Sequence, residues 1–91
     1  MVIIRPMFGV RYSKQSVKAL RKMPVGIAKK IQSIMLEIAK NPAGYQGDWK
    51  RLEGSEFWRL RVGGWRAICA VQDDELIVLV LKIAPRGDVY K

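Results

Sequence analysis

The sequence predicts an α+β fold, in which an N-terminal strand and a helical hairpin pack on one face of a small antiparallel sheet. Two observations predict this class. Apolar residues between positions 14 and 40 recur at helical spacing, and the second half of the chain holds short apolar runs separated by turn residues. Strands that follow one another directly pair as antiparallel neighbours, so the helices are left to cover one face of their sheet.

Length and composition indicate a single domain over residues 1–91. Of the 91 residues, 49% are hydrophobic and 27% are charged, which is an ordinary globular balance. The chain holds no low-complexity tract and no linker. It is large enough for one hydrophobic core but not for two.

The first elements are a strand and two helices. Residues 2–12 mix β-branched and aromatic side chains, which predicts a strand that is interrupted near Pro6. Ser13 is a good N-cap for the first helix, and Pro24 closes that helix or opens the next. The second helix has one apolar face and ends at residues 41–42, which are Asn and Pro. Its apolar face consists of Ile27, Ile31, Ile34, Met35 and Ile38.

The second half of the chain predicts a loop and a three-strand meander. Residues 43–56 are rich in turn formers, with a short extended piece around residues 50–52. The expected strands are residues 57–62, 65–71 and 76–83, joined by turns at Gly63-Gly64 and Asp73-Asp74. The last strand is apolar at nearly every position, so we expect it to be central and covered on both faces.

The Gly63-Gly64 hairpin has two different faces. If the two glycines form a two-residue turn, Arg61 lies directly opposite Arg66. Arg59 points to the same side as Arg61 because strand side chains alternate. The polar face then consists of Phe57, Arg59, Arg61, Arg66, Ile68 and Ala70. The core face consists of Trp58, Leu60, Val62, Trp65, Ala67, Cys69 and Val71.

The polar face gathers three guanidinium groups with no acid among them, although like charges placed opposite each other destabilise a sheet. Bound phosphate would offset this repulsion, since arginine presents a planar fork of donors that suits phosphate oxygens. The alternative is that acids of residues 53–56 or Asp88 pair with the arginines, or that solvent screens them. The chain has 17 basic and 8 acidic residues, a net charge of +9, which favours a nucleic acid or another acidic partner.

The composition excludes several classes of site. The chain has no histidine, which excludes Ser-His-Asp and Cys-His catalysis. With no histidine and a single cysteine, Cys69, it has too few nitrogen or sulfur ligands for a metal, and we expect no cofactor. One unpaired cysteine in an apolar run is typical of a reducing cytoplasm, where we expect the protein. The N-terminal residues lack the pattern of a secretory leader, and the longest apolar run, "LIVLVL", is too short to cross a membrane.

Further residues extend the predicted phosphate site. Arg86 and Tyr90 follow a strand adjacent to the hairpin, and a tyrosine beside arginines can stack on a nucleobase. A packing role is the alternative for Tyr90. Lys50, Arg51 and Phe57 are expected to contact RNA around the arginines.

Four segments of the chain resemble the RelE/ParE superfamily of toxins of type II toxin-antitoxin systems: "VRYSKQSVKALRKMP", "KRLEG", "WRLRVGGWRAICAV" and "LVLKIAPRGDVY". The resemblance implies a helical hairpin on an antiparallel sheet, similar to microbial ribonucleases. In the RelE-like branch it implies cleavage of messenger RNA in the ribosomal A site, which inhibits translation. It also implies a cognate acidic antitoxin, and binding to operator DNA only through the toxin-antitoxin complex.

The active residues of that branch match five positions of this sequence. The two basic residues of the first hairpin strand fall on Arg59 and Arg61, and the arginine after the turn falls on Arg66. The arginine and tyrosine near the C-terminus fall on Arg86 and Tyr90. The first two positions are lysine in the best-known enzyme of the family. A guanidinium is a poor general base, so the exchange keeps the charge but leaves the proton acceptor unassigned.

The reaction implied by the resemblance is metal-independent attack of the 2'-hydroxyl on the adjacent phosphate, which gives a 2',3'-cyclic phosphate. Two alternatives remain open. One is a toxin resembling ParE, which inhibits DNA gyrase, although Arg66, Arg86 and Tyr90 favour the ribonuclease branch. The other is a non-catalytic basic module that binds RNA.

Overall fold

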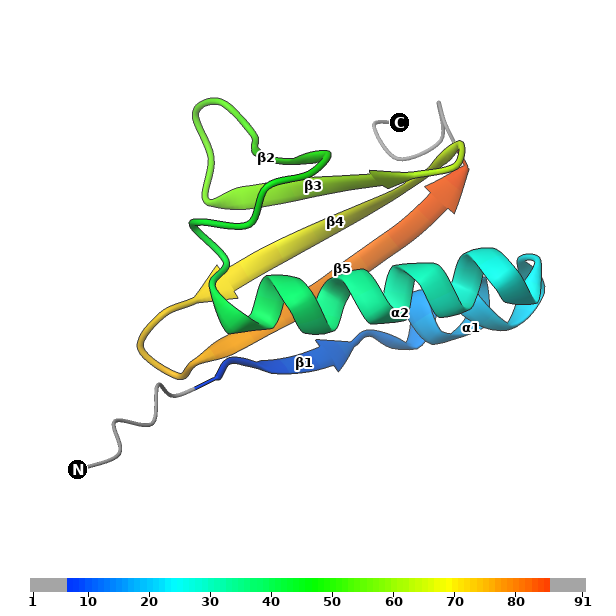
Figure 1. Ribbon diagram of the computed structural model, residues 1–91, viewed down its shortest axis with the longest axis horizontal. Helices are drawn as coiled ribbons and strands as arrows, with labels where there is room; N and C mark the ends of the chain where they lie inside the picture. Colours follow the sequence, from blue (N-terminus) through cyan, green and yellow to red (C-terminus); the bar gives the residue numbers. More distant parts are fainter. Residues whose placement is uncertain (1–6, 86–91) are drawn as a thin grey trace.

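A computed structural model describes residues 7–85 of the chain. Along the chain they form β1 (Gly9–Tyr12), α1 (Lys14–Lys22), α2 (Val25–Lys40), β2 (Trp49–Arg51), β3 (Phe57–Val62), β4 (Trp65–Gln72) and β5 (Ile77–Pro85). The strands make one sheet in the order β1-β5-β4-β3-β2 (Figure 1). The predicted α+β class is confirmed. The sheet is mixed rather than antiparallel, because β5 pairs with β1 in parallel and with β4 in the antiparallel sense.

The two helices begin and end close to the predicted residues. The Ser13 hydroxyl oxygen accepts a hydrogen bond from the backbone N–H of Ser16, which caps the first turn of α1. Pro24 precedes α2, so it opens the second helix, and Asn41 is the C-cap residue of α2. Neither helix is long and apolar enough to span a membrane.

Helix α1 docks on β5 through its first turn. The hydroxyls of Ser13 and Ser16 donate to the backbone oxygens of Leu81 and Val80, at 2.7 and 3.1 Å. The amide group of Gln15 bonds both the N–H and the C=O of Ile83. Strand β1 ends at Tyr12, which pairs with Val80 of β5. The first turn of α1 therefore continues the hydrogen bonding along β5 beyond the end of β1.

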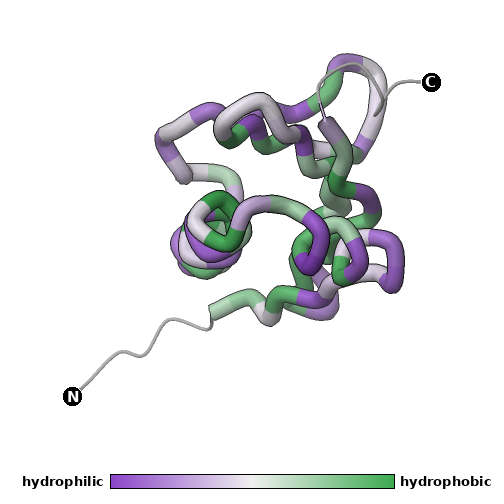
Figure 2. The backbone as a smooth tube through the Cα atoms, turned by 90° about the vertical axis from the view of Figure 1, so that its right-hand side faces the viewer, coloured by the Kyte–Doolittle hydropathy of each residue, from purple (hydrophilic) through white to green (hydrophobic). Residues whose placement is uncertain are grey.

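The core lies between the helices and one face of the sheet, and Figure 2 shows α2 on one side of the strands. The fully buried large side chains come from both layers: Ile31, Met35, Ile38, Leu60, Ile83, Val78, Val80 and Cys69. Trp49 and Trp58 stack at the edge of this core, with ring centroids 5.0 Å apart. The predicted core face of the hairpin is confirmed.

Three predictions about strands need correction. Residues 7 and 8 are not strand, and the earlier part of the predicted first strand lies outside the described residues. The second hairpin turn spans four residues, 73–76, and its Leu76 takes a positive φ of 54°. Strand β5 is an inner strand as expected, but it is fully covered on one face only: Ile77 and Leu79 on the other face are half-buried, since no helix lies over them.

Candidate functional site

The site begins at the hairpin turn between β3 and β4. Gly63 and Gly64 have φ angles of 50° and 80°, the left-handed values that a tight two-residue turn requires at both central positions. Glycine adopts them without the steric cost that a Cβ atom brings. The turn sets the predicted register, in which Val62 pairs with Trp65 and Arg61 pairs with Arg66.

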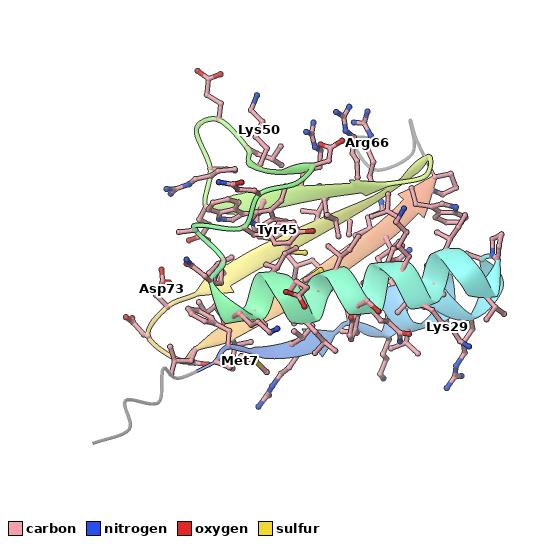
Figure 3. All side chains as sticks on the ribbon, viewed as in Figure 1. Met7, Lys29, Tyr45, Lys50, Arg66 and Asp73 are labelled. Atoms are coloured by element: carbon pink, nitrogen blue, oxygen red, sulfur yellow. The ribbon has the colours of Figure 1, made fainter. Side chains whose placement is uncertain are left out.

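The sheet face that points away from the helices, here called the open face, collects positive charge from the strands of the sheet. One row of paired residues crosses the sheet from β2 to β5. In this row Lys50 pairs with Arg59, Arg59 with Ile68, and Ile68 with Lys82. Paired residues share a face, so these cations join Arg61 and Arg66 there. Figure 3 shows Lys50 and Arg66 at one margin of the molecule, with Lys29 of α2 at the opposite margin.

A carboxylate from outside the hairpin, Asp48, pairs with arginines of the open face, so the alternative of pairing with an acid applies to Arg59 and Arg61. Arg61 Nε donates to Asp48 Oδ2 at 2.8 Å, and Arg59 Nη2 donates to Asp48 Oδ1 at 3.3 Å. Trp49 pairs with Leu60, which places the preceding Asp48 beside Arg61, and the Arg61 N–H donates to the Asp48 backbone oxygen at 3.0 Å.

The acid that pairs with these arginines is therefore not one of those considered from the sequence. Within residues 7–85, the ion pairs of Arg59 and Arg61 are both with Asp48 rather than with residues 53–56. Asp88 lies outside the described residues. Asp48 precedes a three-residue strand in a loop, and no local pattern in that loop indicates its register with β3.

The open face has a pocket of about 250 Å³ at the hairpin end. It is lined by Asp48, Arg61, Gly63, Gly64, Trp65 and Arg66. The arginine side chains supply planar donors to it, and the glycines leave the backbone of the turn uncovered. This arrangement suits an oxyanion such as a phosphate group.

The predicted RNA contacts separate into two groups. Lys50 is exposed on the open face, and Phe57 lies there two residues before Arg59, with 37% of its surface exposed. Arg51 pairs with Trp58, so it lies on the opposite face, where its Nε donates to the backbone oxygen of Ser55. Lys50 and Phe57 are therefore placed to contact a ligand of the open face, and Arg51 is not.

Two cations of the open face were not identified from the sequence. Lys82 is the single charged residue of β5, and a lone cation in an otherwise apolar strand is a signal for an uncovered face. Arg11 of β1 pairs with Leu79, which pairs with Ala70, and this row also belongs to the open face. Its placement follows from a parallel pairing that the sequence did not predict.

Arg86 and Tyr90 lie outside the described residues, so their predicted roles stay predictions. The strand that leads to them ends at Pro85, which pairs with Trp65 of the pocket.

The groups with shifted pKa values lie in the core and not in the pocket. Burial raises the pKa of the Cys69 thiol to about 12, so the thiol stays protonated and unreactive at neutral pH. Burial, and then the nearby Cys69, raise the pKa of Tyr12 to about 12. Over residues 7–85, no group of three or more acidic, cysteine or histidine side chains could hold a metal ion.

Sequence comparison identifies relatives over nearly the whole chain. The family model described as the ParE toxin of the type II toxin-antitoxin system parDE matches residues 10–90. A curated protein of Methanocaldococcus jannaschii, provisionally named toxin RelE1, is 34% identical over 86 residues, which cover 92% of this chain and 96% of that protein.

Solved structures of similar shape include two archaeal RelE chains in complex with RelB. The chain from Pyrococcus horikoshii OT3 has a TM-score of 0.78 and 27% identity, with 92% of this chain and 100% of that chain covered. The chain from Methanococcus jannaschii has a TM-score of 0.71 and 26% identity, with 88% and 94% covered. Together with the family model, these matches show that the chain belongs to the RelE/ParE superfamily and is a RelE-like toxin of a type II toxin-antitoxin system.

Proposed function

We propose that this toxin is an endoribonuclease that cuts messenger RNA in the ribosomal A site and so inhibits translation. The observation that carries the proposal is the open face, where Arg61 and Arg66 line a pocket large enough to admit a phosphate group and Arg59 lies on the same face. Lys50 and Lys82 extend the positive charge on both sides of the arginines. A strip of cations on an uncovered sheet is suited to a single-stranded polyanion.

The chemistry that fits these groups needs no metal. The 2'-hydroxyl of the target nucleotide attacks the adjacent phosphorus, the bond from phosphorus to the 5'-oxygen breaks, and the product carries a 2',3'-cyclic phosphate. Arg61 and Arg66 stabilise the extra negative charge of the pentacovalent phosphate. Phe57 offers a ring on which a neighbouring base can stack, and its place beside Arg59 suits this role.

Arg86 and Tyr90 enter this mechanism from the family pattern alone. Arg86 would add a further positive charge, and Tyr90 would orient the target base by stacking. The chain has no histidine to move protons, so its intrinsic reaction is expected to be slow. A ribosome that holds the message in the attacking geometry would supply the missing positioning.

The same charge supports a cognate antitoxin as partner. The net charge of +9 calls for an acidic protein to neutralise the toxin, and the two archaeal RelE chains were solved with RelB. We expect operator DNA to be bound only through the toxin-antitoxin complex, and the toxin to act in the cytoplasm.

A second candidate function is inhibition of DNA gyrase. It is favoured by one finding, the match of residues 10–90 to a family model named for the ParE toxin. Members of this superfamily share a fold across different targets, so the fold does not separate the two functions.

Primer extension on messages from cells that express the toxin tests the proposal. Breaks inside codons of translated regions are expected, and they should disappear in the Arg66→Ala variant. Lys29→Ala is the matched control, because it removes a cation from the helical layer and should leave the breaks unchanged. Growth inhibition without such breaks, together with inhibited supercoiling by purified gyrase, would identify the second candidate instead. Binding of RNA without breaks would leave a non-catalytic module.

A further inference from the structure

The proposed reaction needs a group that takes the proton of the attacking 2'-hydroxyl. The arginines of the open face cannot do this, because a guanidinium stays protonated in proteins. Of the side chains that line the pocket at the hairpin, Asp48 alone has a carboxylate, the kind of group that can accept a proton. The pocket therefore contains the phosphate donors and one proton acceptor.

Asp48 is held in a defined position on the open face. Its two carboxylate oxygens accept one hydrogen bond each, from Arg61 and from Arg59, and its backbone oxygen accepts a third from the Arg61 N–H. A carboxylate has about four acceptor positions, so two remain for a ligand. Its side chain is 43% exposed, which leaves it within reach of a ligand in the pocket.

The contact with Arg61 brings the carboxylate close to the expected phosphate position. Arg61 binds Asp48 through Nε, which leaves the two terminal nitrogens of the same planar group for phosphate oxygens. Before in-line attack, the 2'-oxygen lies about 3 Å from the phosphorus. One guanidinium can therefore contact the phosphate while its partner carboxylate contacts the attacking hydroxyl.

We propose that Asp48 is the general base of this toxin, a catalytic residue that takes the proton of the 2'-hydroxyl as that oxygen attacks the phosphate held by Arg61 and Arg66. The inference rests on the proposed ribonuclease function. It fills the role of proton acceptor, which the arginines of the open face cannot take.

The proton balance of the step is complete without another reactant. The 2'-oxygen forms its bond to phosphorus and its proton moves to the Asp48 carboxylate. The bond from phosphorus to the 5'-oxygen breaks with its electron pair, and the 5'-oxygen takes a proton from water. The protonated Asp48 returns its proton to solvent, so the products are a 2',3'-cyclic phosphate and a 5'-hydroxyl end.

The test is single-turnover cleavage on ribosomes programmed with a defined message. Asp48→Asn keeps the shape of the side chain but removes its basicity, and a loss of about 10²-fold in cleavage rate is expected. Asp73→Asn is the matched control, because it makes the same change in the exposed turn at the other end of β4 and should cleave at the wild-type rate. Asp48→Glu restores a carboxylate and should recover part of the activity.

The pH dependence distinguishes a base from a residue that only positions Arg61. The wild-type rate should change little between about pH 6 and 8, because the base belongs to the enzyme and no hydroxide is consumed. In Asp48→Asn, hydroxide must replace the base, so the rate should rise about tenfold per pH unit. Binding of a message with a 2'-deoxy nucleotide at the cut site should not weaken, since the variant removes a negative charge from a phosphate site.

The outcomes separate this inference from the proposed function. If the wild-type toxin cuts no message, the ribonuclease function itself is wrong. If the wild type cuts and Asp48→Asn cuts equally fast, or loses rate with a flat pH profile and weaker binding, Asp48 is not the base. Should Asp48→Asn fail to fold, Asp48→Glu decides: a carboxylate variant whose rate rises with pH like a hydroxide reaction contradicts the proposal.

Discussion

At the scale of the residue, Arg61 connects the stability of the fold to the chemistry of the pocket. It lies opposite Arg66 across the hairpin and donates to Asp48 from its Nε. The attraction between Arg61 and Asp48 offsets the repulsion between Arg61 and Arg66. Side chains of Arg61 and Asp48 are 47% and 43% exposed, and ion pairs of such exposure contribute about 0–1 kcal/mol.

The double variant Arg61→Ala and Arg66→Ala tests this balance. It should lose cleavage by at least about 10²-fold, because two donors to the phosphate are gone. Its unfolding free energy should change by less than about 1 kcal/mol, because the lost ion pair and the lost repulsion compensate. Thermal unfolding followed by circular dichroism measures the second quantity. A large fall in melting temperature would mean that the arginines hold the fold rather than the ligand.

At the scale of the element, the β3–β4 hairpin depends on the conformation of its turn. A Cβ atom at Gly64 would meet nothing within 4 Å, so space does not restrict this position. Its φ of 80° does, because side chains branched at Cβ avoid the left-handed region. This turn also keeps Arg61 and Arg66 side by side at the pocket.

Gly64→Val should therefore lower the unfolding free energy by about 1 kcal/mol or more through the backbone alone. Gly64→Asn is the matched variant, since asparagine tolerates positive φ and should cost clearly less. Urea denaturation of both variants gives the comparison. Equal stability of the valine and asparagine variants would show that the turn relaxes without cost.

At the scale of the whole molecule, the core holds two acidic groups in their neutral forms. Cys69 pairs with Val80, and Val80 pairs with Tyr12, so thiol and phenol lie in one row across three strands. Their folded pKa values of about 12 exceed the ordinary values of 9.0 and 10.0. The folded state therefore holds these protons more tightly, and the stability they contribute is complete below about pH 9 and lost as pH rises toward 12.

Tyr12→Phe removes one of the two groups and should flatten this alkaline loss. Urea denaturation at about pH 9 and about pH 11 should show a smaller drop in unfolding free energy for the variant than for the wild type. The comparison between the two proteins cancels the effect of lysine titration, which both share. An identical drop in both would exclude Tyr12 as a source of the pH dependence.

Local patterns in the sequence determined the helices, the hairpin and half of the site. Helical spacing of apolar residues and a serine cap are properties of adjacent residues, so α1 and α2 were predicted nearly to the residue. Glycine at two successive positions predicted the turn, and the turn paired Arg61 with Arg66. The alternation of strand side chains then assigned the core face correctly.

Tertiary structure alone decided which other side chains join the arginines. The parallel pairing of β1, the face of Arg51 and the position of Lys82 all depend on registers between segments far apart in the sequence. When the pairing register of a strand slips by one residue, every side chain of that strand moves to the other face of the sheet. A three-residue strand carries too few side chains to specify its register. Asp48 meets Arg61 only because β2 pairs with β3 in one register, so the acid that completes the pocket is visible only in the folded chain.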